Sequence, residues 1–329
     1  MGIRVIKPGV FTSIQDTGRY GYQRFGVPVS GSMDRYAGAV SNILCGNSWD
    51  TAVLEINFHG TKLFFDEEHI ISFTGGGARA CTEDGELLPI NRAIYIPQYS
   101  VIDTCYHSSG SRLYMAVAGG IDVPRVMNSR SSYPPAGVNY QLKDKDIFKS
   151  LQPSDLARKI MDILRCKKIH AAKWGPADSM IDYTNEFIRA MNGPEWEYFD
   201  SKAHSIFFNT PFCISRASDR MGYRLEMKNP TLPLQLSQPH EMISTAVTKG
   251  TVQVVSEGSP LILMSDAQTT GGYPRIAQII AADIPLLAQK KPGESIRFVS
   301  VSQEEAEFLY LNQIKDLLRL EKNLKAKFL

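Results

Sequence analysis

Short hydrophobic runs bounded by turn residues dominate the first part of the chain. Between residues 3 and 125 these runs are rich in β-branched or aromatic side chains, and Gly, Pro, Asn or Asp residues separate them; they include 53–58, 63–65, 70–73, 93–96, 101–105 and 113–117. Such closely spaced short strands are typical of a β-barrel or sandwich, whereas alternating β and α units would place a helix after each strand. The pattern therefore predicts a mainly β fold.

One helix is expected among these strands. Asp34 can cap a segment in which Ala37, Val40 and Leu44 fall on one face, and Gly46 follows as a stop signal. An Asp before the first turn accepts backbone N–H groups, and a Gly after the last turn adopts the left-handed conformation that ends a helix. The sequence thus predicts a helix that begins just after Asp34.

A second helix is expected at residues 153 to 168, where hydrophobic positions recur at helical spacing after Ser154. We interpret it as a connector between two strand-rich halves. The predicted domains are an N-terminal barrel at 1–152, a helical connector at 153–172, a C-terminal barrel at 173–301 and a terminal helix at 302–329.

The second half also alternates turn signals with short hydrophobic runs, at 252–255, 261–264, 276–280 and 296–301. Before them, Thr184 to Met191 is predicted to be a helix that ends at the turn sequence Asn192-Gly193-Pro194. The terminal helix has the clearest start signal, because Ser302 and Glu305 have the spacing of a capping box.

Charge and composition exclude several functions. The 329 residues include 36 Lys and Arg against 34 Asp and Glu, a net charge of +2, so no overall field attracts nucleic acid or anionic lipid. No apolar run is long enough to span a membrane, and the start of the chain lacks the apolar core of a signal peptide. We therefore expect a soluble, cytoplasmic protein with no nucleic-acid or membrane partner.

The five cysteines are scattered; the closest pair is Cys81 and Cys105, and no C-x-x-C spacing occurs. We expect reduced thiols in a reducing cytoplasm and no metal site. The six histidines are isolated, and neither a G-x-S-x-G nor an H-E-x-x-H motif is present. A phosphate-binding G-x-x-x-x-G-K-[ST] loop is also absent, so the chain is not expected to bind ATP through such a loop.

Three glycine-containing segments have the side chains to bind a small polar ligand. In the first, residues 13–37, glycines allow close backbone approach, and the candidate groups are Gln15, Asp16, Arg19, Ser30 and Asp34. The alternative is a surface loop in which Asp16 and Arg19 pair with each other.

The second segment, residues 215–225, has Ser218, Asp219 and Arg220, with Arg224 four positions after Arg220. The guanidinium groups could bind a carboxylate or phosphate in a bidentate manner, or Asp219 could simply neutralise Arg224.

The third segment, residues 265–277, has a dense run of polar and flexible residues that suits an amide or ureido group, although such a run also makes an ordinary β-turn. Its members are Gln268, Thr269, Thr270, Gly271, Gly272 and Tyr273.

The order of these motifs resembles the biotin-dependent carboxyltransferase family. The matching pieces are S-x-Q-D-x-G-R-x-G-x-x-x-x-G-V-P-x-S-G-x-M-D, which includes Met33, then A-x-x-N-x-L-x-G-N, S-D-R-M-G-x-R-L and D-x-Q-T-T-G-G-Y-P-R-I-A. The family is also called allophanate hydrolase subunit 2 and includes the C component of 5-oxoprolinase and KipA-like antagonists of a kinase inhibitor. The resemblance runs from about Ile3 to Phe298.

The resemblance implies two cyclophilin-like β-barrel domains and a chain that works in a complex. Its expected partners are a subunit-1 protein, which is the KipI-like B component, and a LamB/YcsF-like A component. Together they would form an ATP-dependent 5-oxoprolinase that opens 5-oxoproline to glutamate. Two alternatives remain: carboxyl transfer to urea, with biotin carried on another protein, and KipA-like regulation without catalysis.

By position, the resemblance places a catalytic set at Asp16, Asp219, Arg220, Gln268, Thr269 and Thr270. A substrate-binding set follows at Gln15, Arg19, Ser30, Asp34, Ser218, Arg224, Gly271, Gly272 and Tyr273. We expect Arg220 and Arg224 to orient an anionic group, the 268–270 side chains to hold a lactam amide, and Asp16 or Asp219 to act as base.

The chain departs from the family pattern near these segments. Ala267 stands where Arg is usual, Thr245 and Ala246 replace an expected acidic residue and glycine, and Val255 replaces Pro. The glycine-rich segment expected around Gly137 is missing. Losing an Arg removes a fixed charge for an anionic substrate, so substrate or activity could differ from better-matched members.

Overall fold

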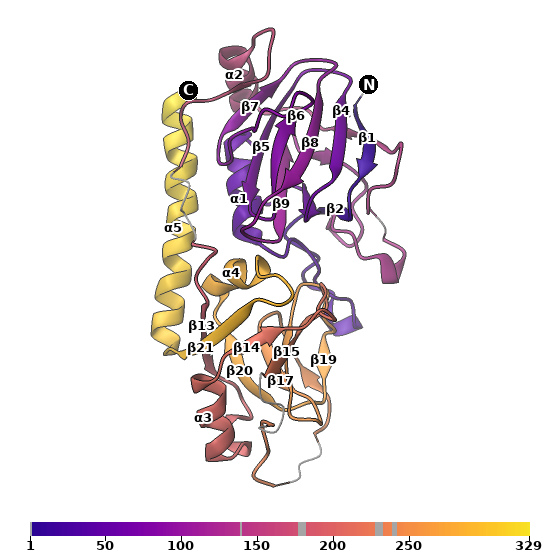
Figure 1. The fold of residues 1–329 in the computed structure, drawn as a ribbon. Coiled ribbons are helices and arrows are strands. Elements are labelled where there is room, and N and C mark those ends of the chain that lie inside the picture. The colour runs from indigo at the N-terminus through magenta and orange to yellow at the C-terminus, as the bar shows by residue number, and fades with distance from the viewer. Residues whose placement is uncertain (1, 139, 177–181, 228–232, 239–241) are drawn as a thin grey trace. The chain divides into compact units, whose positions relative to one another are not determined.

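The computed structural model describes every residue except 1, 139, 177–181, 228–232 and 239–241 (Figure 1). The chain divides into two compact units, which are described separately. Unit 1 consists of Met1–Arg19, Ser30–Tyr183 and Ile314–Leu329, and unit 2 consists of Tyr20–Val29 and Thr184–Gln313. The residues predicted as a connector, 153–172, fall within unit 1, and the chain passes to unit 2 after Tyr183.

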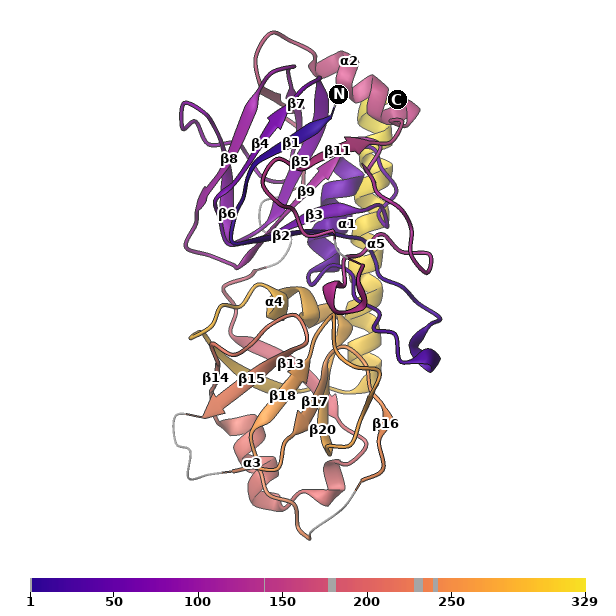
Figure 2. The ribbon, with the colours of Figure 1, turned by 90° about the vertical axis from the view of Figure 1, so that its right-hand side faces the viewer.

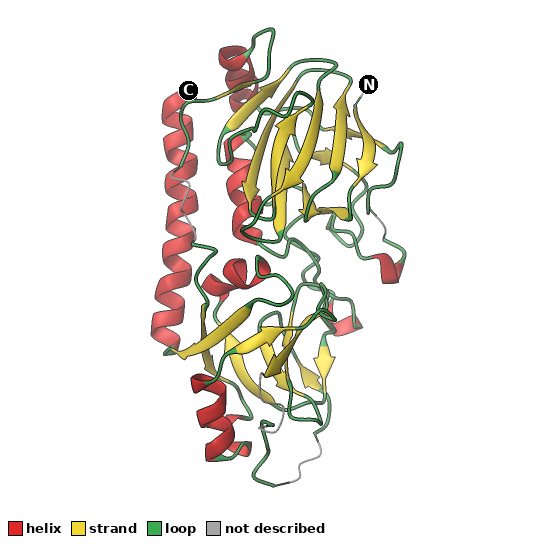
Figure 3. Ribbon diagram, viewed as in Figure 1, coloured by secondary structure: helices red, strands yellow, loops and turns green. Residues whose placement is uncertain are grey.

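Unit 1 contains two six-stranded antiparallel sheets (Figures 1 and 3). One has the order β10 (Ile121–Asp122), β11 (Ile147–Ser150), β1 (Ile3–Pro8), β4 (Thr61–Phe65), β8 (Val101–Tyr106) and β6 (Ala78–Thr82). The other has the order β12 (His170–Ala171), β7 (Ala93–Ile96), β5 (His69–Gly75), β9 (Arg112–Val117), β3 (Val53–Asn57) and β2 (Phe11–Gln15).

A single hydrophobic core joins these two sheets. It combines side chains of the first sheet such as Val5 and Phe65 with side chains of the second such as Ile56, Phe73 and Met115, all buried. Burying branched and aromatic side chains contributes roughly 1.5–3 kcal/mol each, which explains why the hydrophobic runs of the sequence form these strands.

Three helices cover the second sheet of unit 1. They are α1 (Arg35–Leu44), α2 (Asp155–Leu164) and the C-terminal part of α5 (Gln303–Phe328), whose buried side chains form one cluster with Tyr95 and Tyr114. The predicted caps are present: Asp34 accepts the Ala37 N–H at 2.8 Å, and Ser154 accepts the Ala157 N–H at 3.1 Å. The predictions of these two helix starts are confirmed.

Unit 2 is built on a closed seven-stranded barrel (Figure 2). Its order is β13 (Phe187–Asn192), β20 (Arg275–Ile279), β17 (Thr251–Val254), β18 (Pro260–Leu263), β15 (Gly222–Met227), β14 (Phe212–Ile214) and β21 (Ser295–Ser300). Neighbours are antiparallel except β13 and β21. The prediction of a mainly β fold with a C-terminal barrel is confirmed.

Other elements of unit 2 surround the barrel. Phe207 of α3 (Ser201–Asn209) stacks on Phe298 of β21 with ring centroids 4.3 Å apart. Strands β16 (Thr245–Ala246) and β19 (Thr270–Gly271) form a separate two-stranded sheet, and α4 spans Ile284–Ala288. Short 3-10 turns complete both units at Gln23–Phe25, Pro134–Ala136, Trp196–Tyr198 and Ala281–Asp283.

The helix predicted from Thr184 to Met191 is wrong, because this segment contains the barrel strand β13. Ile188 and Ala190 are fully buried, whereas Phe187, Arg189 and Met191 are not. This alternation has the period of a strand, and pairing with both β20 and β21 satisfies its backbone. Helix α3 was not predicted from the sequence, although Asp200 caps it by accepting the Ala203 N–H at 2.6 Å.

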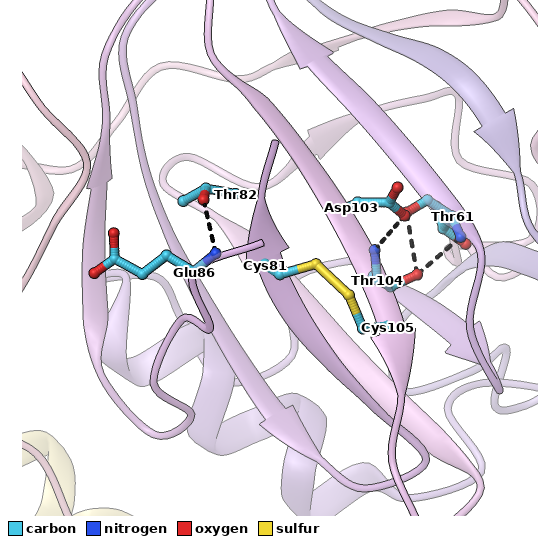
Figure 4. Close-up of a disulfide and its surroundings, with 7 residues drawn as sticks. All are labelled: Thr61, Cys81, Thr82, Glu86, Asp103, Thr104 and Cys105. Carbon is cyan, nitrogen blue, oxygen red and sulfur yellow. Dashed lines mark hydrogen bonds between the residues drawn. A yellow bond between two sulfur atoms is a disulfide. The ribbon is translucent and has the colours of Figure 1, made fainter. Parts of the chain in front are cut away.

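The prediction of reduced thiols is wrong for one pair, because Cys81 of β6 and Cys105 of β8 form a disulfide (Figure 4). The residues are 24 positions apart, but β6 and β8 are paired strands in which Asp103 lies opposite Cys81. Strand pairing therefore brings together two thiols that the sequence spacing separates. Cys45, Cys166 and Cys213 are free.

The long helix α5 begins after Ser302, whose hydroxyl accepts the Glu305 N–H at 3.2 Å, as the capping prediction requires. Its first turns pack in unit 2, where Ala306 lies in a cluster with Ile280 and Ala282. Its last turns pack in unit 1 through Leu320 and Leu324. Within the described residues, no helix is both long and apolar enough to cross a membrane.

Candidate functional site

In unit 1, Asp16 binds a neighbouring loop through its carboxylate. Oδ1 accepts the Gly18 N–H at 2.8 Å and the hydroxyls of Ser129 and Ser131 at 2.7 and 2.5 Å, while Oδ2 accepts the Arg130 N–H at 2.6 Å. Four donors on one carboxylate fix its orientation. This arrangement holds the 129–131 segment against the end of β2.

Gln15, Arg19 and Ser30 are all buried beside this loop. Arg19 donates a hydrogen bond to the Ser131 carbonyl, and Gln15 donates to the Ser13 hydroxyl at 3.0 Å. Among the described residues, Gln15 Oε1 and Ser30 Oγ have no hydrogen-bond partner. Ser30 also adopts a left-handed φ of 57°, a conformation that is uncommon for a residue with a side chain.

Asp34 caps α1 and accepts a second hydrogen bond. Its Oδ2 accepts the Tyr183 hydroxyl at 2.9 Å, while Oδ1 holds the first turn of the helix. Burial, followed by the charge of Asp34, raises the pKa of Tyr183 well above its ordinary value. Tyr183 is therefore protonated and donates the hydrogen bond. The Asp34 carboxylate, which was expected to bind a ligand, joins Tyr183 to the start of α1 within unit 1.

Glu55 of β3 is a buried carboxylate that belongs to none of the three predicted segments. It accepts the Met33 N–H and the Tyr114 hydroxyl, both at 2.8 Å, and Arg112 lies 3.9 Å away. Tyr114 in turn accepts the Asp34 N–H at 2.8 Å, and burial, followed by Glu55, raises its pKa. This network anchors the 30–34 turn. In the sequence, the only sign of it is a single Glu inside a hydrophobic strand.

In unit 2, Asp219 and Ser218 build the turn between β14 and β15. Asp219 Oδ1 accepts the N–H groups of Met221 and Gly222 at 2.8 and 3.2 Å, and its side chain is exposed. Ser218 Oγ accepts the Arg224 N–H at 3.0 Å. The turn therefore places the Asp219 carboxylate beside the start of β15.

The two arginines of this segment differ in their surroundings. Arg220 forms a bidentate ion pair with Asp266, with contacts of 2.7 and 3.1 Å, and both side chains are about nine-tenths buried, at 11% and 9% exposure. Arg224 is exposed, and its hydrogen bonds to other described residues are made by its backbone. The Arg220–Asp266 pair brings the second and third sequence segments together.

The third segment contains β19, which pairs with β16 in the two-stranded sheet, and the loop before it. Gln268, Thr270, Gly272 and Tyr273 are exposed, whereas Thr269 is partly buried and its carbonyl accepts the Val247 N–H at 3.0 Å. The position where the family usually has Arg is filled by Ala267, which packs in a small cluster with Val247 and Leu263.

Gln253 and Thr245 are two further polar residues, which stand at or beside the departures from the family pattern at Val255 and Thr245–Ala246 and were not expected to bind a ligand. Gln253 of β17 is fully buried, and its Nε2 donates to the Tyr273 carbonyl at 3.2 Å. Among the described residues, neither Gln253 Oε1 nor Thr245 Oγ1 has a hydrogen-bond partner. A buried polar atom without a partner costs about 1–3 kcal/mol, so both atoms require an explanation.

A second ion pair, between Arg275 and Glu195, holds the first residue of β20. Glu195 Oε2 accepts two hydrogen bonds from Arg275, one from the backbone N–H at 3.0 Å and one from the side-chain Nε at 2.7 Å. Burial by itself would raise the pKa of Glu195, but the hydrogen bonds from Arg275 outweigh it and the pKa lies below its ordinary value. This pair is structural, because it ties Glu195, at the end of β13, to β20.

The glycine run 74–77 does not form a phosphate-binding loop. The Gly76 N–H donates to the Arg112 carbonyl at 2.8 Å, and the Gly77 N–H donates to Ser109 at 2.6 Å. An anion site needs such N–H groups to point at the ligand. Within the described part of the chain, no cluster of three His, Cys, Asp or Glu side chains could hold a metal ion.

The candidate residues thus fall into two groups, one in each unit. Gln15, Asp16, Arg19, Ser30 and Asp34 belong to unit 1, and all the candidates from 218 onward belong to unit 2.

Comparison with known proteins adds family information to this geometry. The family model "Carboxyltransferase domain, subdomain A and B" matches residues 25–300. The chain is 36% identical to the C component of 5-oxoprolinase from Escherichia coli over 92% of this chain and 93% of that protein. It is 30% identical to urea amidolyase of Saccharomyces cerevisiae over 94% of this chain, but this match covers only 17% of that protein.

A solved structure has the same fold. The crystal structure of the Kluyveromyces lactis urea carboxylase superimposes with a TM-score of 0.85 at 26% identity, covering 98% of this chain and 29% of that one.

Proposed function

The chain belongs to the carboxyltransferase domain family, and from that premise we propose that it is the C component of an ATP-dependent 5-oxoprolinase, which opens 5-oxo-L-proline to L-glutamate. One observation carries the proposal. The match to a protein named as this component of 5-oxoprolinase spans almost the whole of both chains, 92% and 93%, whereas the urea amidolyase match spans 17% of a much longer protein.

In this proposal unit 2 binds the lactam substrate. The exposed Arg224 binds the substrate carboxylate, because a guanidinium forms two parallel hydrogen bonds with a carboxylate. Asp219 acts as the base, since its carboxylate is exposed beside β15, whereas Asp16 accepts four hydrogen bonds, three of them from the 129–131 segment. Arg220 is a positioning residue, because its guanidinium is held by Asp266.

The residues present do not form a phosphate-binding loop for ATP. The chain has no phosphate-binding lysine loop, and the N–H groups of Gly76 and Gly77 are bound to its own carbonyls. We therefore assign the ATP-dependent step to no residue of this chain. A KipI-like B component and a LamB/YcsF-like A component are the proposed partners, and the proposed location of the complex is the cytoplasm.

The test is a reconstitution. The purified chain is mixed with the two companion proteins, ATP and 5-oxo-L-proline, and glutamate is quantified. We expect glutamate only when all three proteins and ATP are present. A mixture that forms a stable complex yet yields no glutamate would contradict the proposal and favour a KipA-like regulatory role.

Carboxyl transfer to urea is a second candidate, which the match to urea amidolyase and the fold of urea carboxylase support. It requires a carboxybiotin group on another protein. Incubating the chain with a carboxybiotinylated carrier and urea distinguishes the two candidate functions. Consumption of carboxybiotin that depends on urea favours carboxyl transfer. No consumption of carboxybiotin, together with glutamate formation in the reconstitution, favours the 5-oxoprolinase.

A further inference from the structure

Helix α5 has a second, exposed face besides the one that packs in the two units. Its buried side chains include Ala306, Leu320 and Leu324. Away from these, seven exposed positions follow one another at alternating spacings of four and three residues, and we name them the α5 seam. They are Glu304, Phe308, Leu311, Lys315, Leu318, Lys322 and Lys325.

The spacing of the α5 seam is the heptad pattern of a helix that pairs with another helix. Because a coiled coil has about 3.5 residues per turn, positions at alternating steps of three and four residues form one continuous line. Phe308, Leu311 and Leu318 expose 61%, 52% and 55% of their surface along it. The seam lies on one uninterrupted helix of 26 residues, so its geometry follows from α5 alone (Figure 1).

The charges of the α5 seam select the direction of the partner helix. Glu304 lies at the N-terminal end, whereas Lys315, Lys322 and Lys325 lie from the middle of the helix onward. A parallel second copy would place each lysine beside the same lysine of its partner, and like charges in contact oppose association. An antiparallel second copy instead brings the acidic end of one helix to the basic end of the other. The two ends of the seam are therefore complementary to each other.

We propose that two copies of the chain associate through an antiparallel pairing of their α5 helices. The two-fold axis is level with residue 313 along the helix, so that seam positions equally far from 313 lie opposite each other. Three kinds of contact result, and the symmetry makes each of them twice. Between one copy and the other they pair Glu304 with Lys322, Phe308 with Leu318, and Leu311 with Lys315.

Each kind of contact is favourable. Phe308 and Leu318 remove apolar surface from water. Leu311 packs on the aliphatic stem of Lys315, whose ammonium group stays in solvent. Glu304 and Lys322 form an ion pair at both ends of the apolar part, which fixes the register. The pairing uses none of the candidate site residues, so it does not depend on the proposed reaction.

The test is sedimentation equilibrium of the purified full chain over a range of concentrations. We expect a reversible dimer with a Kd on the order of 10 µM, because the apolar part of the seam extends over only about three helical turns. Phe308→Glu should raise Kd at least tenfold, since it places a charge against Leu318 in both symmetric contacts. Ile163→Glu is the matched control: Ile163 of α2 is also 61% exposed but lies outside the seam, so Kd should stay unchanged.

Charge reversal tests the antiparallel direction. Lys322→Glu sets two carboxylates against each other and should raise Kd about tenfold, whereas adding Glu304→Lys in the same chain restores an opposite-charge pair and should bring Kd back to within about threefold of wild type. Lys327→Glu, an exposed lysine of the same helix outside the seam, is the control and should leave Kd unchanged.

Three results would overturn the dimer. The first is a wild type that stays monomeric up to about 200 µM. The second is a dimer whose Kd changes with neither Phe308→Glu nor Lys322→Glu, and the third is a double charge variant that remains as weak as the single one. A monomeric wild type that loses binding to a companion protein in Phe308→Glu assigns the seam to that protein and also rejects the second copy.

Discussion

The acidic candidates of unit 1 and the polar candidates on the unit 2 barrel have opposite surroundings. Asp16 and Asp34 accept hydrogen bonds from the 129–131 segment, the first turn of α1 and Tyr183, whereas Gln253 and Thr245 bury atoms that have no partner among the described residues. Residue chemistry alone makes the carboxylates the better candidates for catalysis. Hydrogen-bond satisfaction separates the two sets, because a fully engaged group builds structure, whereas an unsatisfied buried group requires an explanation.

The largest expected effect is on the stability of unit 1. Asp16→Ala leaves four donors without an acceptor, at about 1 kcal/mol each, so the free energy of unfolding should fall by about 4 kcal/mol. Urea denaturation measures it. Asp50→Ala is the matched control, since Asp50 accepts one exposed hydrogen bond from Ser48 and should cost less than about 1 kcal/mol. Equal losses in the two variants would show that the Asp16 network is not structural.

The next effect separates the two arginines of unit 2. Arg220→Met leaves Asp266 buried and unpaired, and should lower the free energy of unfolding by about 3 kcal/mol. Arg224→Ala should change stability by less than about 0.5 kcal/mol but raise KM for 5-oxo-L-proline about 30-fold, the loss of a charge-assisted pair. Steady-state kinetics of the assembled complex measure KM. Arg216→Ala, an exposed arginine of the same turn, is the control, and an equal rise in KM there would remove Arg224 from the site.

The smallest effect concerns pH. The pKa of Glu195 is lowered, so the stability that its pair with Arg275 contributes is complete above the ordinary value of 4.5 and is lost as pH falls through the folded-state value. Between pH 5 and pH 3, wild type should lose up to about 2 kcal/mol more than Glu195→Gln. Urea midpoints at a series of pH values test this, and parallel curves for the two proteins would contradict it.

The sequence predicted those parts of the fold that local rules determine. Asp34, Ser154 and Ser302 each accept the expected backbone N–H, because a helix cap depends on residues only three positions apart. The segment before Asn192 was mistaken for a helix because both of its partners, β20 and β21, are distant in the sequence. The disulfide was missed for the same reason, since strand pairing brings its cysteines together.

The site was predicted only in part. The glycine-rich run 271–272 was found from composition, but the reason for it, the amide of Gln253 lying on Gly271, depends on contact between two strands that are not neighbours in sequence. Thr245 was noted only as a departure from the family pattern, and Gln253 was not among the predicted site residues. Likewise, the sequence could not separate Arg220 from Arg224, because the partner of Arg220, Asp266, is supplied by a different segment.

Helix α5 has a consequence for how the protein is made. Leu317, Leu320, Leu324 and Phe328 belong to the cluster that closes unit 1 over α1 and α2, yet the ribosome adds them after all of unit 2. The α5 side of this cluster therefore remains open while the intervening 130 residues, Thr184–Gln313, are synthesised. The complete unit 1 can therefore form only after unit 2 has been synthesised.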